Sequence, residues 1–376
     1  MNYKKSFPIF FSLLISFLLA TNSLFAQNDI PVGTWRTHLT YFDAHSLALA
    51  DNRVYCASQN ALFYFDKDTQ ETQTLSTIEG LSDTKIASLA YHEATKTLVI
   101  AYKNGNIDLL NDAQGKGNEQ ITNIRSILNA NQLTNKSIYH VNLDGDFAYL
   151  STDFGIVVLD LNTQRIKETY SNIGESGTQL KVYSSTTTSQ NIVLATEIGL
   201  RSASLSNTVN RLDFTNWTTL VSSSNVKTVG SQGETIYFGT DQEQFYSYSN
   251  GQKNPLGLSE TDFYSITNSN AKLLICSELG LFELNSIGNL EIIFDDKIHK
   301  PQQAFYDASS KLWIADLEGG LTTNSQGSFE NMYPSGTFSS TAVDVNFFDN
   351  QTVVVSGGSD AKQVKVLQLI NAFRFR

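Results

Sequence analysis

Hydrophobic and polar positions alternate along most of the chain in short runs that share one recurring form. A run of β-branched and aromatic residues leads into a small residue, two variable residues, a glycine in most copies, and a second apolar run. Self-similarity of this kind is the sequence signature of a repeat architecture. The form recurs seven times, at intervals of 37 to 50 residues, and its copies begin at Val54, Leu98, Ala148, Ile192, Ile236 (degenerate), Leu273 and Leu312.

Each copy predicts a β-hairpin. Its two runs have the composition of a pleated, half-buried strand, and glycine or asparagine at the turn can adopt the positive φ that tight hairpins require. A further apolar run precedes each copy, for example residues 86–91 before the second copy and 138–141 before the third. A leading strand, a hairpin and an outer strand make a four-stranded sheet of about 40–50 residues, which is the size of a propeller blade.

These elements predict an all-β fold, a single seven-bladed β-propeller with four-stranded antiparallel blades, over residues 27–352. A hairpin cannot bury its apolar face alone, and radial stacking buries each sheet between two neighbours. Two stacked sandwiches are the alternative, but they would not give one hairpin motif at a near-constant period. We hypothesise that residues 35–39, Trp-Arg-Thr-His-Leu, add a strand to the last blade and lock the ring.

The first 26 residues have the pattern of an export signal. Lys4 and Lys5 precede an apolar stretch at residues 9–20, and Ser-Leu-Phe-Ala at 23–26 offers a cleavage site. An uncleaved anchor is the alternative, and no cysteine follows that would mark a lipoprotein. We therefore predict a signal peptide at 1–26, no transmembrane segment in the mature chain, and export to the periplasm or the outer-membrane cell surface.

The repeat pattern stops near the C-terminus. An eighth apolar run begins at Val353, but residues 362–376 abandon the form and include four basic residues. Two interpretations of the tail at 353–376 remain open. It is either a short C-terminal helix or strand, or the truncated or frame-shifted start of a second domain.

Charge and cysteine usage narrow the function classes. The chain has 26 basic and 37 acidic residues, a net charge of −11, and loss of residues 1–26 would remove two lysines and make it −13. Such a charge argues against a nucleic-acid binder that works by neutralising phosphates. Cys56 and Cys276 lie in apolar runs far apart in the sequence, so we interpret them as small buried residues rather than as a disulfide.

No residues in the sequence carry the spacing of a catalytic or metal site. The histidines at 38, 45, 92, 140 and 299 are scattered, and neither a nucleophile elbow nor a Walker loop occurs. Asp66 and Asp68, or Asp144 and Asp146, could touch calcium, but acidic turn residues are commoner. We therefore predict a protein that is not an enzyme, with no catalytic, cofactor or metal residues and with an unknown binding site.

A few large or charged residues are assigned structural roles first. Trp35, Trp217 and Trp313 are expected to pack in blade cores or between blades. Arg36 and His38 lie in the opening motif and could face a partner, although a structural role is favoured.

Three stretches together point to a family. They are Val-Gly-Thr-Trp-Arg-Thr-His-Leu-Thr-Tyr at 32–41, Thr-Ile-Glu-Gly-Leu-Ser-Asp-Thr-Lys-Ile at 77–86, and Tyr-Lys-Asn-Gly-Asn-Ile-Asp-Leu at 102–109. The chain resembles the N-terminal propeller of PorZ-like proteins from the type IX secretion system of Bacteroidota. The Gly-Leu-Ser segment at 80–82 also resembles repeats of periplasmic sensor propellers attached to hybrid two-component kinases.

The resemblance implies a function in protein secretion. Family members carry two propellers and a C-terminal sorting domain, and they sit at the cell surface with a sortase-like protease and an outer-membrane barrel protein. They are implicated in passing an anionic lipopolysaccharide to the protease. The chain is thus expected to be a non-catalytic scaffold or binding module with these partners and no nucleic acid, and an anionic glycolipid would need a local basic patch. A periplasmic ligand-sensing propeller and a lyase or hydrolase are the alternatives.

Overall fold

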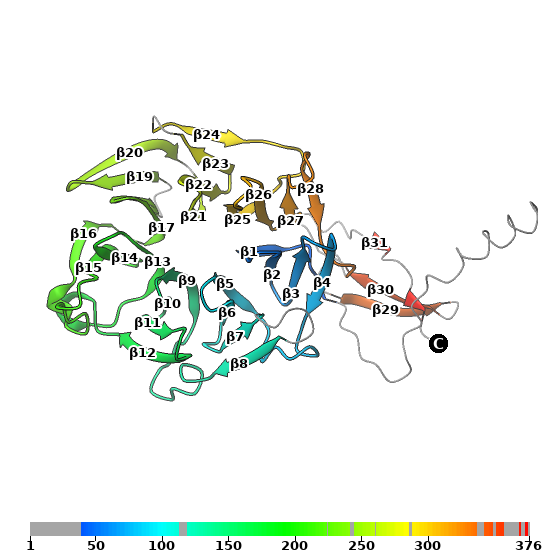
Figure 1. Ribbon diagram of the computed structural model, residues 1–376, viewed down its shortest axis with the longest axis horizontal. Helices are drawn as coiled ribbons and strands as arrows, with labels where there is room; N and C mark the ends of the chain where they lie inside the picture. The colour runs from blue at the N-terminus through cyan, green and yellow to red at the C-terminus, as the bar shows by residue number, and fades with distance from the viewer. Residues whose placement is uncertain are drawn as a thin grey trace, which may run out of the picture. The chain divides into compact units, whose positions relative to one another are not determined.

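The computed structural model describes the chain over several ranges. They are residues 39–112, 119–223, 225–240, 244–259, 261–285, 288–336, 342–348, 351–356, 368–369 and 373–374. Seven four-stranded sheets follow one another within residues 44–332, and in each sheet the spatial order of the strands is their sequence order, with antiparallel pairing. The protein is a seven-bladed β-propeller, as the repeat predicts (Figure 1).

The strands of the first four blades have the following bounds. Blade 1 contains β1 (Ala44–Leu49), β2 (Arg53–Ser58), β3 (Leu62–Asp66) and β4 (Glu71–Leu75); blade 2 contains β5 (Ile86–His92), β6 (Thr97–Tyr102), β7 (Ile107–Asn111) and β8 (Gln120–Ile124). Blade 3 contains β9 (Ile138–Asp144), β10 (Phe147–Thr152), β11 (Gly155–Asp160) and β12 (Arg165–Tyr170); blade 4 contains β13 (Val182–Thr187), β14 (Asn191–Thr196), β15 (Gly199–Ser204) and β16 (Thr218–Ser222).

The remaining three blades continue the same order. Blade 5 contains β17 (Val226–Gln232), β18 (Thr235–Thr240), β19 (Gln244–Ser249) and β20 (Gln252–Ser259); blade 6 contains β21 (Phe263–Ser269), β22 (Lys272–Ser277), β23 (Gly280–Leu284) and β24 (Leu290–Ile293). Blade 7 contains β25 (Pro301–Tyr306), β26 (Leu312–Asp316), β27 (Gly320–Thr323) and β28 (Glu330–Met332). The predicted hairpins are the second and third strands of each blade, and each predicted start lies within one residue of the observed strand.

The repeat glycine is required where the third strand begins. Gly155 has a φ of +127°, and a Cβ there would lie 1.9 Å from the carbonyl oxygen of Tyr170 in the outer strand. Gly199 repeats the arrangement in blade 4, with a φ of +118° and 2.1 Å to the oxygen of Val221. Glycine alone tolerates both this backbone conformation and the close approach of the neighbouring strand.

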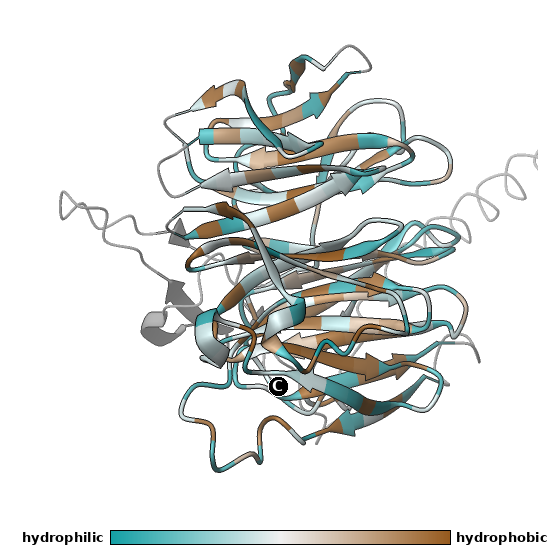
Figure 2. Cartoon of the chain, turned by 90° about the vertical axis from the view of Figure 1, so that its left-hand side faces the viewer, coloured by the Kyte–Doolittle hydropathy of each residue, from teal (hydrophilic) through white to brown (hydrophobic). Residues whose placement is uncertain are grey.

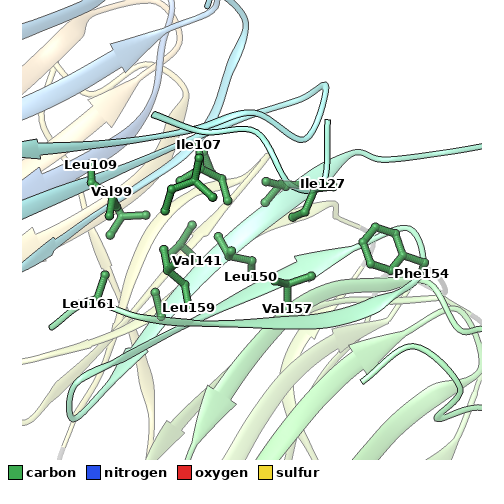
Figure 3. Close-up of a cluster of buried hydrophobic side chains, with 14 residues drawn as sticks. Val99, Ile107, Leu109, Ile127, Val141, Leu150, Phe154, Val157, Leu159 and Leu161 are labelled. Carbon is green, nitrogen blue, oxygen red and sulfur yellow. The ribbon is translucent and has the colours of Figure 1, made fainter. Parts of the chain in front are cut away.

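The core is divided among the interfaces between neighbouring blades, which we call seams. The seam between blades 2 and 3 shows the pattern. Val99, Ile107 and Leu109 of blade 2 face Val141 and Leu150 of blade 3 (Figure 3), and all five are buried. Along many strands apolar and polar residues alternate (Figure 2), so each sheet offers apolar side chains to its neighbours.

The first and seventh blades close the ring. The inner strands β1 and β25 lie next to each other, as do the inner strands at every other seam. Trp313 of blade 7 is buried against Phe65 of blade 1, with ring centroids 5.6 Å apart. The backbone N–H of Gly320 donates to the oxygen of Phe42 at 2.8 Å. All four strands of blade 7 come from residues 301–332. We expected residues 35–39 to add a strand to this blade, but residues 35–38 lie outside the described residues.

A ring of polar side chains also joins the inner strands. The third residue of every inner strand is polar. At five seams its side chain accepts a hydrogen bond from a backbone N–H of the next blade, so neither of the two polar groups is left unpaired. The pairs are Ser46 with Leu89 (3.0 Å), Ser88 with Val141 (3.2 Å), His140 with Ser185 (3.5 Å), Ser184 with Val229 (3.0 Å) and Gln303 with Leu47 (2.9 Å). Gln303 has the longer side chain and makes this bond at the closing seam.

Four further strands follow the propeller. β29 (Ala342–Phe348) pairs with β30 (Gln351–Ser356), and β30 also pairs with the two-residue strands β31 (Gln368–Leu369) and β32 (Phe373–Arg374). The predicted boundary at residue 352 falls inside β30, and the domain limits stay predictions. Among the described residues the helices are two single 3₁₀ turns, Glu175–Gly177 and Phe214–Asn216, and none is long and apolar enough to cross a membrane.

Candidate functional site

Each inner strand begins with the same irregularity. Its second residue is skipped in the register with the neighbouring strand, which makes a β-bulge in all seven blades. A bulge re-aims a side chain, and here all seven bulges lie at the starts of the inner strands, where the central channel typical of a propeller would open. The skipped residues are His45, Ala87, Tyr139, Tyr183, Lys227, Tyr264 and Gln302.

The bulges of blades 3, 4 and 5 form the most developed group of side chains at this end. We call it the channel-mouth cluster and define it by Tyr139, Asp153, Lys181, Tyr183, Asn225 and Lys227. The rings of Tyr139 and Tyr183 lie 6.0 Å apart between centroids. The Nζ of Lys181 lies 4.6 Å from the Tyr139 ring and 5.2 Å from the Tyr183 ring. Lys227 approaches Tyr183, with its Nζ 4.8 Å from the ring centroid.

Hydrogen bonds hold these rings in place. The Tyr139 hydroxyl donates to Asp153 Oδ1 at 2.6 Å, and the Tyr183 hydroxyl donates to Asn225 Oδ1 at 3.0 Å. Asp153 lies in the hairpin turn of blade 3 and also accepts from the backbone N–H of Ser137 at 3.0 Å. The hairpin turn is thereby fixed to the start of the inner strand, so the cluster rests on rigid elements.

Interactions within the cluster stabilise the charged forms of Asp153 and Lys181. Burial opposes ionisation of Asp153, but hydrogen bonds from Tyr139 and Ser137 and the charge of Lys181, 3.4 Å away, outweigh it and lower the pKa of Asp153. The interaction with Tyr139 and the charge of Asp153 raise the pKa of Lys181. Burial raises the pKa of the Tyr139 hydroxyl, and its bond to Asp153 acts in the same direction. These shifts favour a charged Asp153 beside a charged Lys181, with the Tyr139 hydroxyl neutral.

Such a set of groups suits binding. Aromatic faces attract sugar rings, other aromatic rings and cations, while lysine attracts carboxylate and phosphate. Lys227 is exposed and lies at the open side of the cluster. Lys181 is paired with Asp153, so Lys227 is the cluster's exposed cation that an anionic partner could meet. Within the described residues no group of three or more histidine, cysteine or acidic side chains could hold a metal.

The residues singled out in the sequence lie elsewhere. Trp217 and Trp313 are buried between blades, which confirms their predicted packing role, whereas Trp35, Arg36 and His38 lie outside the described residues. Cys56 and Cys276 are free and buried, in agreement with the sequence interpretation.

The acidic pair Asp66 and Asp68 occupies a turn. Asp66 Oδ1 accepts from the backbone N–H groups of Asp68 and Thr69, both at 3.0 Å. This is the arrangement expected of an acidic turn residue.

The channel-mouth cluster was missed because its members have no characteristic spacing in sequence. They come from three strands and three connecting segments, and only the fold brings them together. One signal was present. When the runs that precede the hairpins are aligned, their second residue is tyrosine in three of the seven copies, at 139, 183 and 264.

Comparison with known proteins confirms the predicted resemblance. Residues 54–218 match the model of the PorZ N-terminal β-propeller domain of the type IX secretion system. No curated protein is matched by the sequence. The match covers blades 2 and 3 together with most of blades 1 and 4.

Solved structures support the fold. PorZ of Porphyromonas gingivalis, described as an essential bacterial surface component of the type IX secretion system, aligns with a TM-score of 0.71 and 24% identity over 88% of this chain and 44% of its own. The extracellular domain of a hybrid two-component system protein from B. thetaiotaomicron aligns at 0.61 and 16% identity, over 89% of this chain and 46% of its own.

A third structure extends the likeness beyond bacteria. The Cps50 (Swd1) β-propeller domain of Myceliophteria thermophila aligns with a TM-score of 0.57 and 10% identity, over 79% of this chain and 99% of its own. The chain spans less than half of the first two solved chains.

Proposed function

We propose that this chain is a non-catalytic binding module of an exported protein and that it acts as a PorZ-like scaffold in type IX secretion at the cell surface. The observation that carries the proposal is the match of residues 54–218 to the PorZ N-terminal propeller domain. The rigid blades with polar turns at the channel mouth support a role in gripping partners. By resemblance, the partners are a sortase-like protease and an outer-membrane barrel protein.

The channel-mouth cluster is the proposed contact for an anionic ligand, for which an anionic lipopolysaccharide is the candidate. Lys227 would meet acidic groups, and the two tyrosine rings would stack on sugars. Asp153 fixes Lys181 and Tyr139 and thus positions the Tyr139 ring for this role.

Gene deletion with complementation tests the proposal. Loss of the gene in the source organism is expected to block secretion of cargo that carries a sorting signal, and the wild-type chain should restore it and co-purify with the protease. The double variant Lys181→Glu and Lys227→Glu should restore secretion poorly, while Lys167→Glu, on an outer strand, should restore it fully. Unimpaired cargo secretion in the deletion strain would overturn the scaffold function.

A ligand-sensing propeller is the second candidate, and the alignment with the two-component system domain favours it. A sensor would leave cargo secretion intact and change transcription of a ligand-dependent set of genes. Measuring both readouts in the same deletion strain separates the two functions.

A further inference from the structure

The seam between blades 5 and 6 opens to the outside at its outer edge. A cleft of about 500 Å³ lies there, with Leu256 and Leu258 of β20 on one side and Phe282 and Leu290 of β23 and β24 on the other. β20 is irregular at this place. β19 and β20 pair at Tyr246–Pro255 and again at Gln244–Ser259. Between these two pairs β19 advances by two residues and β20 by four. The extra residues include Gly257 with a φ of +74°, and they keep β20 from following its neighbour.

An apolar stripe continues outward from this cleft. Leu290 and Ile292 lie two residues apart in β24, which places their side chains on one face, and Phe294 follows directly after the strand ends at Ile293. We call them the rim stripe. Ile292 is 56% exposed and Phe294 is 83% exposed. Because Phe282 pairs with Ile292, and Leu284 with Leu290, the two stripe residues in β24 belong to the blade 6 face that packs toward blade 5.

β24 is also an open sheet edge. It is the outermost strand of its blade, and no strand in the described part of the chain pairs with its far side (Figure 1). Natural sheets protect such edges with charged side chains, as β12 of blade 3 does with Arg165 and Lys167. β24 has the sequence Leu-Glu-Ile-Ile and carries no basic residue.

The charges next to the rim stripe select the occupant. Glu291 is exposed on the strand itself, and Asp295 and Asp296 follow directly after the stripe. Lys297 pairs with Asp296 at 3.5 Å, which leaves Glu291 and Asp295 as the carboxylates with no ion pair in the described part of the chain. Symmetric pairing with a second copy would bring these carboxylates against their own counterparts, which disfavours it. A protein of net charge −11 also has no general attraction for an anionic membrane surface.

We propose that the rim stripe and the cleft beside it form a docking site for an extended segment of another protein, in which apolar and basic residues alternate. The segment adds a fifth strand to blade 6 along the edge of β24. Its apolar side chains enter the cleft between β20 and β24, and its basic side chains meet Glu291 and Asp295. Strand addition of this kind obtains affinity from backbone hydrogen bonds and specificity from alternate side chains. The site goes beyond the proposed binding role at the channel mouth.

Peptide binding to the purified full chain tests the site. The probe is a fluorescent nonapeptide in which lysine alternates with valine and one phenylalanine, and the readout is anisotropy. We expect saturable binding that the double variant Ile292→Thr and Phe294→Ser weakens at least tenfold. The matched control, Ile78→Thr and Leu212→Ser, removes two exposed apolar residues from other blades and should bind as the wild type does.

Two further measurements separate strand addition from simple attraction. N-methylation of the internal amides of the peptide should abolish binding, and grouping its lysines at one end at equal composition should weaken it at least tenfold. Glu291→Lys should weaken the lysine peptide and strengthen a peptide with glutamate in place of lysine. This variant lies at an exposed position and keeps the apolar stripe intact.

Several results would overturn the site. Equal binding of the N-methylated or lysine-grouped peptide would show attraction without strand pairing. A concentration-dependent dimer that the double variant abolishes would assign the stripe to a second copy, and vesicle flotation that depends on Phe294 would assign it to lipid. These assays use purified protein, so they fail or succeed independently of the secretion assay.

Discussion

The seam between blades 3 and 4 and the seam between blades 5 and 6 have the same strand arrangement but end differently at the outer edge. In the first, Trp217 is buried against Tyr170, with ring centroids 5.9 Å apart, and its Nε1 donates to the oxygen of Arg211 at 2.8 Å. Arg211 Nε donates in turn to the Tyr170 hydroxyl at 3.1 Å. The long loop between β15 and β16 supplies both Trp217 and Arg211, and it closes the seam.

The seam between blades 5 and 6 has no such cover in the described residues. Its outer edge is the cleft of about 500 Å³ beside the rim stripe. At the inner end of this seam, Thr228 is the third residue of the inner strand of blade 5, but its Oγ1 has no hydrogen-bond partner among the described residues. The blades stay joined at the far end of the inner strands, where Asn268 donates to the oxygen of Ser231 at 3.0 Å. A propeller thus needs its inner strands joined, while the outer edge of a seam is free to bind.

Replacing the repeat glycine by alanine should give the largest difference in unfolding free energy between the two seams. Gly155 and Gly280 hold equivalent positions with the same φ of +127°, but the nearest atom to a Cβ is the Tyr170 oxygen at 1.9 Å in one and Ile292 Cδ1 at 3.8 Å in the other. We expect Gly155→Ala to cost about 4 kcal/mol of unfolding free energy, from strain and overpacking together. Gly280→Ala should cost about 1–2 kcal/mol, from strain alone. Urea denaturation of both variants measures this, and equal losses would show that the outer strand yields to the added methyl group.

Truncation of an aromatic side chain gives the next largest contrast. Trp217→Ala removes a ring that is 4% exposed. It should cost about 3–4 kcal/mol through lost burial and the cavity that remains. Phe294 is 83% exposed, so Phe294→Ala should change the unfolding free energy by less than about 0.5 kcal/mol. A large loss for Phe294→Ala would mean that the rim stripe is part of the core rather than a docking surface.

Most of this architecture follows from the sequence, but the difference between the seams does not. The hairpin repeat predicts the blades because strand propensity and turn chemistry are local properties. The first and last predicted hairpins start at Val54 and Leu312, and each start lies within one residue of the start of an observed strand. Tyr139 and Tyr183 meet only after two blades stack, so no local pattern announces the channel-mouth cluster. The rim stripe was hidden for a related reason. Ile292 and Phe294 are apolar like core residues, and their exposure is seen only in the folded structure.

Acid should weaken the closed seam through His140. Its Nδ1 accepts from the N–H of Ser185, and burial lowers the pKa of His140 to about 4, below the ordinary 6.5 of the unfolded chain. The unfolded state therefore binds the proton more readily between these values. The stability that neutral His140 provides is complete above pH 6.5 and is lost as the pH falls toward 4, by roughly 2 kcal/mol.

The variant His140→Asn keeps an acceptor but does not titrate, and it tests this effect. Unfolding free energies at pH 7 and at pH 4.5 should differ less in the variant than in the wild type. His45 has its pKa lowered to about 4 by burial as well, so part of the acid sensitivity should remain. An unchanged pH dependence would show that folding does not lower the pKa of His140.

The inner ring gives the smallest contrast, between Ser184 and Thr228. Ser184 Oγ accepts from the N–H of Val229 at 3.0 Å, so Ser184→Ala leaves that donor without its partner and should cost about 1 kcal/mol. Thr228 Oγ1 is buried without a partner in the described chain, so Thr228→Val removes a desolvated hydroxyl at equal shape and should leave stability unchanged or raise it by about 1 kcal/mol. Thermal unfolding of the two variants gives opposite shifts in Tm on this account. A loss in both would mean that Thr228 makes its inner-ring bond in solution, and the seam between blades 5 and 6 would then be joined at its inner end as the seam between blades 4 and 5 is.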